Sequence, residues 1–269
     1  MGTRVLGPLL LPVLYVQGRR VRRTVPLLPE PPGARTGRRG LPPSTNVMNP
    51  AADDTAHPDA HPDALPRTTG PALRLLIVGD SAAAGVGAPS QDVALLGQLV
   101  DALSAEGPVD WRLEARTGAT AAGTRLHLAK LAPQPFDVAV TSLGLNDVTG
   151  GRAPADVVAD LVAVVELLRT RFGVRHVVVS GIPPVGEFPA LPQPLRGYLG
   201  RRARAVDEAL AAWAATASHV EHLPLDFARD QAAIPSAMAS DGFHPGPALY
   251  TVWARALADR IAAWRSAGA

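Results

Sequence analysis

Short apolar runs alternate with longer stretches of helical periodicity from residue 73 to the end of the chain. Residues 73–79 read LRLLIVG, a nearly continuous apolar run ending in glycine, which is typical of a strand buried on both faces of a parallel sheet. Similar runs predict four more strands, at 111–116, 137–144, 175–181 and 220–225. Apolar residues at helical spacing predict five helices, at 92–105, 120–131, 154–172, 195–217 and 247–265.

Strands and helices therefore alternate, which favours the α/β class and a three-layer α/β/α sandwich around a five-stranded parallel sheet. In open sheets of this kind, ligands bind beyond the carboxyl ends of the strands. Candidate functional residues are accordingly those that follow a predicted strand or precede the last helix. They lie at 79–81, 117–118, 144–147, 181–184 and 241–246.

Composition divides the chain into three parts: a basic and apolar N-terminal extension (1–45), a linker (46–71) and one globular domain (72–269). Pro, Ala, Asp and Thr dominate the linker, and HPDA occurs twice in succession at 57–64. We expect a polar spacer there, not a metal site. Hydrophobic residues make up 47% of the chain, which is enough apolar material to give the domain a buried core.

The positive charge of the chain is concentrated near its N-terminus. Residues 1–40 contain eight Arg and a single Glu, whereas the whole chain has a formal net charge of only +2. The remainder is therefore net acidic, so the basic patch that a nucleic-acid partner would require is not expected on the domain. The chain contains no Cys, which excludes disulfides, thiolate catalysis and thiolate-ligated metal centres.

An apolar run from residue 6 to residue 16 contains two prolines and is followed by four arginines within residues 19–23. The run is shorter than the roughly 20 apolar residues of a bilayer-spanning helix. The arginines come after the apolar run, whereas the basic residues of a signal peptide come before it. Two interpretations of residues 6–23 stay open: an extension packed on the domain surface, and a weak anchor at an anionic membrane surface. The expected location is the cytoplasm, either free or at the periphery of a membrane.

Ser81 follows the first predicted strand of the domain, in the segment GDSAAAGVG (79–87). Taken alone, this motif fits an N-cap serine at a strand-to-helix turn as readily as a nucleophile. The glycine spacing does not match the G-x-G-x-x-G cradle of a dinucleotide site, which disfavours a nucleotide-binding domain. Ala83 excludes the G-x-S-x-G elbow of the α/β-hydrolases.

A base for Ser81 is available in the loop DGFHPG (241–246), immediately before the last predicted helix. Asp241 can bind one ring nitrogen of His244, which leaves the other nitrogen free to take the proton of Ser81. A serine hydroxyl is a poor nucleophile at neutral pH, so this base is what nucleophilic catalysis requires. The loop alone would equally fit a turn stabilised by Asp and Gly.

Hydrogen-bond donors for an oxyanion are available at two other predicted strand ends. Gly118 can donate a backbone N–H, and Asn146 of GLND (144–147) can donate its side-chain amide. With the N–H of Ser81 they would form an oxyanion hole of three donors. The neighbouring Asp80 and Asp147 are expected to tie their loops by accepting backbone N–H groups.

These segments together resemble the four signature blocks of the SGNH (GDSL-like) hydrolase family: GDS, a Gly after the second strand, G-x-N-D and D-x-x-H. The resemblance covers residues 72–269 in the family's order and spacing, and it implies the flavodoxin-like fold of that family. The catalytic residues that it implies are Ser81, Asp241 and His244. The oxyanion donors that it implies are Ser81, Gly118 and Asn146. Ala82 replaces the Leu of the GDSL motif, at a position that varies in the family.

The expected function is therefore that of a serine hydrolase that cleaves a small-molecule acyl ester through an acyl-enzyme, with neither a metal nor an organic cofactor. The family's substrates include simple acyl esters, lysophospholipids, thioesters and acetylated sugars, and the sequence leaves these alternatives open. The lack of a long inserted lid favours short or medium acyl chains. A non-catalytic acyl-ligand-binding protein on the same fold is the alternative from another class, against which the intact Ser81, Asp241 and His244 argue.

Overall fold

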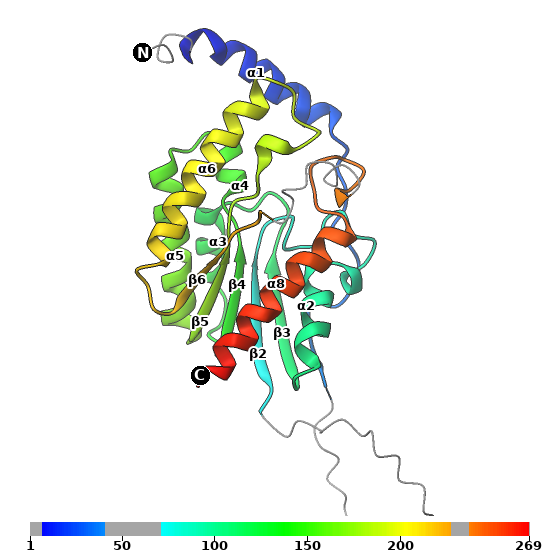
Figure 1. Ribbon diagram of the computed structural model, residues 1–269, viewed down its shortest axis with the longest axis vertical. Coiled ribbons are helices and arrows are strands. Elements are labelled where there is room, and N and C mark those ends of the chain that lie inside the picture. Colours follow the sequence, from blue (N-terminus) through cyan, green and yellow to red (C-terminus); the bar gives the residue numbers. More distant parts are fainter. Residues whose placement is uncertain (1–6, 41–70, 227–236, 269) are drawn as a thin grey trace, which may run out of the picture.

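A computed structural model describes residues 7–40, 71–226 and 237–268 of the chain, and the side chains from residue 11 onward. The predicted linker lies outside these ranges except for residue 71. The described residues form one six-stranded sheet with helices on both faces (Figure 1). Five of its strands run parallel to one another: β2 (Leu73–Gly79), β3 (Val109–Ala115), β4 (Val138–Ser142), β5 (His176–Ser180) and β6 (Val220–Leu223).

The strand order is β1-β3-β2-β4-β5-β6. The five parallel strands, counted along the chain, thus follow the order 2-1-3-4-5 of flavodoxin-like sheets. This confirms the predicted three-layer α/β class. Because β2 pairs with β3 on one side and with β4 on the other, the direction of winding reverses beside β2. Ligands of such sheets bind in the crevice at that reversal, which is where residue 81 follows β2.

The prediction of a five-stranded sheet is wrong by one strand. Residues Thr36–Arg39 form β1, which pairs antiparallel with β3 at the edge of the sheet. Its sequence TGRR carries no apolar residue, and all four residues are exposed, so no hydrophobic alternation marks it as a strand. Backbone pairing with a neighbour already in place is enough to recruit such an edge strand.

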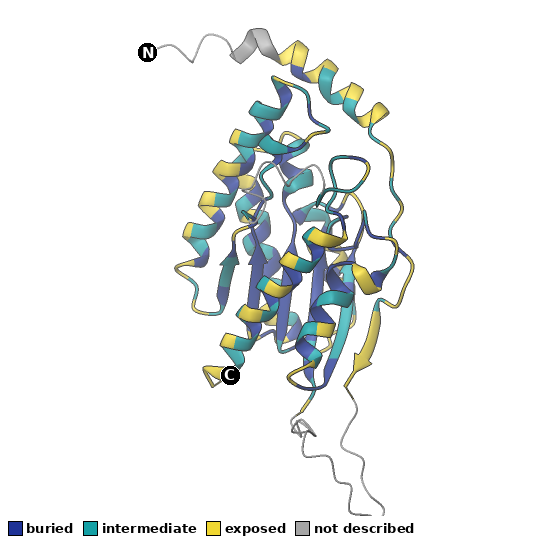
Figure 2. Ribbon diagram, turned by 45° about the vertical axis from the view of Figure 1, so that its right-hand side comes forward, coloured by how far each residue is buried: buried dark blue, intermediate teal, exposed yellow. Residues whose placement is uncertain are grey.

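The central strands are formed by β-branched and aliphatic residues that are buried on both faces of the sheet. All five residues of β4 (VAVTS) and of β5 (HVVVS) are buried. Val and similar residues favour strands because their χ1 freedom is restricted and they pack well on a pleated surface. Figure 2 shows these strands as a continuous buried layer under more exposed helices.

Two helices cover one face of the sheet: α2 (Leu95–Ser104) and α8 (Pro247–Ser266). Leu75 and Ile77 of β2 point into the core between this face and the two helices. Alternate residues of the same strand, Leu76 and Val78, point to the opposite face. There they pack with α3 (Ala121–Leu128), α4 (Leu145–Thr149), α5 (Pro154–Phe172) and α6 (Leu195–Ala214).

Local signals explain where the longest helices begin and end. Pro154 and Pro247 stand in the first turn of α5 and α8, where a missing N–H costs nothing and the fixed φ suits a helix. Gly173 ends α5 in the left-handed region, with φ of +60°. Two single-turn 3-10 helices, η1 (Gln91–Val93) and η2 (Val185–Glu187), lie in the loops after β2 and β5.

Helix α1 (Gly7–Thr24) lies across the end of the molecule toward which the parallel strands point (Figure 1). Leu14 is buried against the main core, and the side chain of Gln17 is hydrogen-bonded to the turn before α6. Most of its other described side chains are exposed, as Figure 2 shows. From α1 the chain runs down the outer side of the sheet to β1.

Candidate active site

Ser81 stands in a tight turn directly after β2. The turn is held by backbone hydrogen bonds from Ala84 to the Asp80 carbonyl and from Val86 to the Ser81 carbonyl. The buried hydroxyl of Tyr250 on α8 donates to the carbonyl of Val86 at 2.7 Å, which fixes the turn against the last helix. Ser81 is only 8% exposed, so its hydroxyl lies in a defined, largely dehydrated position.

His244 and Asp241 meet Ser81 from the loop before α8, 163 residues further along the chain. The Nε2 atom of His244 lies 2.9 Å from the Ser81 Oγ, and the Nδ1 atom lies 2.5 Å from the Asp241 Oδ2. The other carboxylate oxygen of Asp241 accepts the backbone N–H groups of Phe243 and His244 at 2.9 and 3.0 Å. The structure thus brings together the three residues that the sequence predicts as a catalytic set.

The two buried carboxyl groups beside Ser81 have pKa values shifted in opposite directions. Burial raises the pKa of Asp80 to about 7, since the hydrogen bond from the Ala82 N–H only partly offsets it. Burial also acts on Asp241, but the hydrogen bonds from His244 and from two backbone N–H groups outweigh it and lower its pKa. Asp241 is therefore an anion beside the imidazole, as a residue that stabilises an imidazolium must be.

Asn146 lies in the first turn of α4, directly after β4, and lines the same pocket as Ser81 and His244. Its Nδ2 atom donates to the carbonyl of Ala119 at 2.9 Å and lies 3.4 Å from the Asp80 Oδ2. The second of these contacts is long, so one amide hydrogen can turn to a substrate oxygen without loss of a strong bond.

Gly118 lies next to Ala119 in the exposed turn between β3 and α3, with φ of +77°. It is not among the residues that line the pocket of Ser81, but the Asn146 bond to Ala119 ties its turn to the site. Within the described ranges, neither the Ser81 N–H nor the Gly118 N–H has a hydrogen-bond partner. Both are therefore available to an incoming acceptor.

The neighbouring carboxylates hold their loops as predicted. Asp80 accepts the N–H of Ala82 at 3.1 Å, and Asp147 accepts the N–H of Ala121 at 3.0 Å. The second bond joins the start of α4 to the start of α3, and Asp147 is only 1% exposed. Asp147 therefore fixes two of the loops that surround the pocket relative to each other.

A cavity of about 80 Å³ opens beside Ser81 and His244. Its walls are largely apolar and come from four separate loops and from α8. The side chains that form them include Leu145, Pro183, Phe188, Met238, Phe243 and Trp253. Leu145, Pro183 and Phe243 lie in segments that the sequence marks as candidates, and Trp253 lies in the last predicted helix. Phe188 and Met238 lie outside those segments, so the sequence did not assign them to a site.

The geometry agrees with the comparison to known proteins. The model of the GDSL-like lipase/acylhydrolase family matches residues 77–252 of the chain. The chain belongs to this family. The matched region begins within β2 and ends within α8, so it contains Ser81, Asn146 and His244 but neither α1 nor β1.

A known GDSL-like protein is also similar to this chain in sequence. The GDSL-like esterase Rv1075c of Mycobacterium tuberculosis is 31% identical over 189 residues, which are 67% of this chain and 59% of that protein. The chain therefore spans less than two thirds of that relative's length.

Solved structures of GDSL-like proteins share the fold. A lipolytic protein of the G-D-S-L family from Veillonella parvula superposes with a TM-score of 0.57 at 19% identity, over 70% of this chain and 97% of that one. TesA superposes with a TM-score of 0.54 at 27% identity, over 68% of this chain and 95% of its own.

Two further properties concern metals and membranes. In residues 7–40, 71–226 and 237–268, no group of three or more His, Asp or Glu side chains is placed to hold a metal ion. No helix in those ranges is both long enough and apolar enough to cross a bilayer. The expectation that catalysis needs no cofactor stays a prediction.

Proposed function

We propose that this GDSL-like protein is a carboxylic ester hydrolase that works through an acyl-enzyme on Ser81. One observation carries the proposal: a continuous chain of hydrogen bonds runs from the Ser81 Oγ through both ring nitrogens of His244 to the Asp241 carboxylate. Nucleophile, base and orienting carboxylate in this order are the requirements for activating a serine hydroxyl.

In the first half of the reaction, the Ser81 Oγ attacks the carbonyl carbon of the ester while His244 Nε2 takes the hydroxyl proton. The carbonyl oxygen becomes an oxyanion that accepts hydrogen bonds from the N–H groups of Ser81 and Gly118 and from the Asn146 amide. The tetrahedral intermediate then collapses, the carbon–oxygen bond to the alcohol breaks, and the imidazolium of His244 returns its proton to the leaving alkoxide.

In the second half, a water molecule takes the place of the alcohol. His244 removes a proton from this water as it attacks the acyl-enzyme carbonyl, and the same donors bind the second oxyanion. Collapse of this intermediate breaks the ester bond to Ser81, which regains its proton from His244, and releases the carboxylic acid. Asp241 stays ionised throughout and holds the ring of His244 in the productive tautomer.

The cavity walls support a short or medium acyl chain as the preferred acid part of the substrate. A water-sized group occupies about 10–15 Å³ on the same measure, so the cavity of about 80 Å³ holds roughly five to eight such groups. Apolar walls stabilise acyl methylene groups by about 0.8 kcal/mol each when water is excluded. Lysophospholipids, thioesters and acetylated sugars remain alternative substrates that differ in the alcohol or thiol part.

The proposal is tested by an acyl-chain series of p-nitrophenyl esters together with labelling by a fluorophosphonate probe. We expect wild type to be labelled and to hydrolyse the shorter esters fastest. Ser81→Ala should lose labelling and lower kcat by about 10⁴-fold or more, whereas Ser90→Ala, a serine in the same loop but outside the pocket, should behave as wild type. A folded wild type that is neither labelled nor active would favour a non-catalytic acyl-ligand-binding protein.

Of the two interpretations of residues 6–23, the structure gives a specific reason to propose weak association with an anionic membrane surface. Leu11, Tyr15 and Val16 of α1 are 58%, 65% and 64% exposed. They are followed on the same helix by four exposed arginines at 19, 20, 22 and 23, and the described part of α1 contains no acidic residue. Exposed apolar side chains beside arginines are the features of an interfacial helix.

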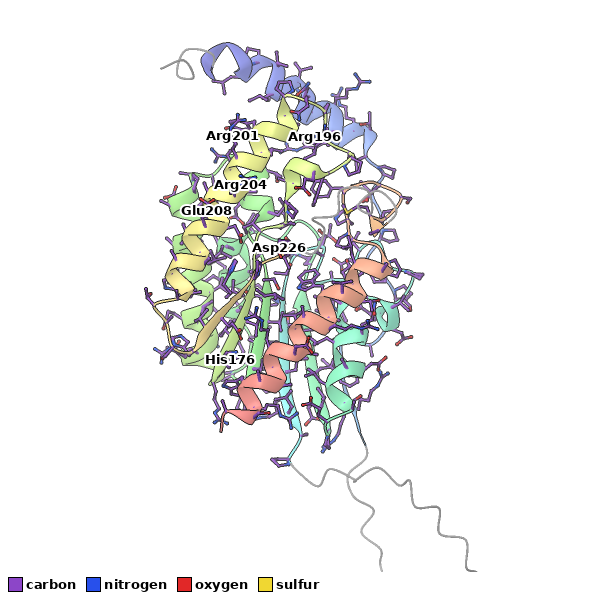
Figure 3. The ribbon with its side chains drawn as sticks, in the orientation of Figure 1. His176, Arg196, Arg201, Arg204, Glu208 and Asp226 are labelled. Atoms are coloured by element: carbon purple, nitrogen blue, oxygen red, sulfur yellow. The ribbon has the colours of Figure 1, made fainter. Side chains whose placement is uncertain are left out.

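Further basic residues lie next to α1. Arg196, Arg201 and Arg204 are placed along the first half of α6, close to the end of the molecule that α1 covers (Figure 3). Contacts between Gln17 and the turn before α6 join the two helices. The predicted cytoplasmic location fits this proposal, since the cytoplasmic leaflet carries the anionic lipids that attract such a surface.

A further inference from the structure

The segment between α1 and the sheet, residues 25–39, will be called the N-terminal arm. After α1 it runs to the outer edge of the sheet, where its last four residues form β1 (Figure 1). The arm lies outside residues 77–252, which the family model matches. It nevertheless contacts two of the three loops that carry the proposed oxyanion donors, those of Ser81 and Gly118.

Glu30 of the arm binds the turn that contains Gly118. Its Oε1 atom accepts two hydrogen bonds from Thr117, one from the backbone N–H at 2.7 Å and one from the hydroxyl at 2.9 Å. Partial burial acts to raise the pKa of Glu30, but these two bonds and the bond from Arg35 outweigh it and lower the pKa. Glu30 is therefore an anion that is hydrogen-bonded to Thr117, the residue before Gly118.

Arg35 holds Glu30 in place. Its guanidinium donates to the Glu30 Oε2 at 2.9 Å and also to the carbonyl of Ala115, the last residue of β3. The backbone carbonyl of Arg35 accepts the N–H of Leu113 at 2.7 Å, which continues the pairing of β1 with β3. The carboxylate of Glu30 is thus positioned by a rigid strand and not only by its own flexible side chain.

The turn that Glu30 binds has few other supports. Gly118 is exposed, and a side chain built at this position would meet no atom within 4 Å. Beyond Glu30, the turn is held by hydrogen bonds from the Arg116 N–H to the Gly79 carbonyl, from the Ala119 N–H to the Arg116 carbonyl and from the Asn146 amide to the Ala119 carbonyl. None of these bonds involves Thr117 or the Gly118 N–H. A backbone donor contributes to catalysis only when its N–H is already aimed at the oxyanion, so this turn needs outside support.

The arm also contacts the turn of Ser81. The carbonyl of Pro32 accepts the backbone N–H of Gln91 at 2.9 Å, and the Gln91 side chain donates to the carbonyl of Ala84 at 2.8 Å. Gln91 is only 3% exposed, so it forms a buried link between the arm and the serine turn. The arm therefore joins the loops after β2 and β3.

We propose that Glu30 is a positioning residue for ester hydrolysis: it fixes Thr117 so that the N–H of the next residue, Gly118, points at the substrate oxyanion. The inference rests on the proposed function of Ser81. It assigns part of the oxyanion site to a segment that precedes the family-matched region. Because the oxyanion forms only in the transition state, loss of Glu30 lowers kcat and leaves substrate binding nearly unchanged.

Kinetics with p-nitrophenyl acetate test the proposal. Glu30→Ala should lower kcat by about 10- to 100-fold, less than the full loss of a donor, with KM within about twofold of wild type. Glu30→Gln keeps an oxygen that can accept from Thr117 and should recover kcat to within about threefold of wild type. The matched control is Arg38→Ala, which removes an ion pair with Asp110 from the same arm without touching the turn; its kcat should not change.

Hydrogen–deuterium exchange of the full chain gives a readout that does not depend on activity. In Glu30→Ala, amide exchange should speed up in the peptide that covers residues 116–120, and peptides from β4 and β5 should exchange as in wild type. Unchanged exchange at 116–120 would overturn the positioning role whatever the kinetics show. Equal losses of kcat in Glu30→Ala and Arg38→Ala would also overturn it. An inert wild type would instead refute the proposed ester hydrolysis, while the exchange comparison would still decide the role of Glu30.

Discussion

Two buried carboxyl groups accompany Ser81: Asp80 precedes it in the chain, and Asp241 is hydrogen-bonded to His244. Asp241 accepts one imidazole and two backbone donors, which is enough to keep its charge in spite of desolvation. Asp80 accepts one strong backbone donor, and its pKa rises to about 7. Deep burial with few donors therefore raises the pKa of Asp80, whereas the donors aimed at Asp241 outweigh its burial and keep that group an anion at neutral pH.

Asp80→Asn is expected to change the pH dependence of stability. The pKa of Asp80 in the folded chain, about 7, lies above the unfolded value near 3.9, so Asp80 stabilises the fold below about pH 4 and this stabilisation is lost as the pH rises through 7. The asparagine does not titrate. The free energy of unfolding of the variant minus that of wild type should therefore increase between pH 4 and 7 and then level off. Urea unfolding at several pH values measures this difference, and a flat profile would contradict it.

Asp241→Asn is expected to lower kcat by about 10³- to 10⁴-fold, because an amide can hold His244 in the wrong tautomer and cannot stabilise the imidazolium. KM should change little, since Asp241 is fully covered by His244 and backbone groups and does not line the cavity. Steady-state kinetics measure both constants. Asp259→Asn, at an exposed position of α8, is the control and should leave both unchanged. A kcat within tenfold of wild type would argue against the role given to Asp241.

The sequence predicted Ser81, Asp241 and His244 because their residue types and their positions at loop ends are both informative. Glu30 carried no such signal. A glutamate in a basic, proline-rich segment looks like any surface residue, and its role arises only from the pairing of β1 with β3, which brings residues 30 and 117 together. Local sequence patterns do not predict contacts between irregular segments that are far apart in the chain.

At the scale of elements, the position of Asn146 depends on how β4 passes into α4. Gly144 makes this turn with φ of +109°, a conformation that other residues rarely adopt, and a Cβ there would lie 2.7 Å from the Ile182 Cδ1. The short helix α4 was not predicted, since five residues are too few to show helical periodicity. By contrast, the long helix predicted around 154–172 corresponds to α5, whose ends carry Pro154 in the first turn and Gly173 just after the last residue.

Gly144→Ala is expected to lower both stability and activity. The strained backbone should cost about 1–3 kcal/mol in the free energy of unfolding, and displacement of Asn146 should lower kcat by about tenfold. Gly173→Ala is the matched control: its φ is also positive but no atom lies within 4 Å of the added Cβ. It should cost roughly 1–2 kcal/mol and leave kcat unchanged. Denaturant unfolding and steady-state kinetics on both variants check this, and equal kcat values in the two would contradict the role of the turn.

At the scale of the whole molecule, the basic residues of α1 and α6 lie at the end of the sheet where the strands terminate and the proposed active site opens. An esterase docked on a membrane through this end would have its cavity near the lipid surface. The net-acidic composition of the remaining chain would oppose binding in other orientations. The proposed membrane association therefore has an expected orientation, with this end of the molecule toward anionic lipid.

Co-sedimentation with lipid vesicles tests this orientation. Wild type should bind vesicles that contain phosphatidylserine, should bind pure phosphatidylcholine far more weakly, and should be released by salt. Replacing both Arg22 and Arg23 by Ala should weaken binding by roughly 30-fold, at about 1 kcal/mol per arginine. Arg255→Ala, an exposed position on α8, is the control. Binding that is equal on both lipids would contradict an electrostatic membrane surface and would leave α1 as an extension packed on the domain.

Strand β1 has a second consequence, which concerns self-association. Without it, β3 would be the edge of the sheet and would present a row of unpaired backbone N–H and C=O groups to other molecules. β1 covers that edge with only four residues, two of which are exposed arginines. Short, charged edge strands resist pairing with a second sheet. The same segment that places Glu30 beside Thr117 thus also covers the edge of β3, through which two sheets could otherwise pair and aggregate.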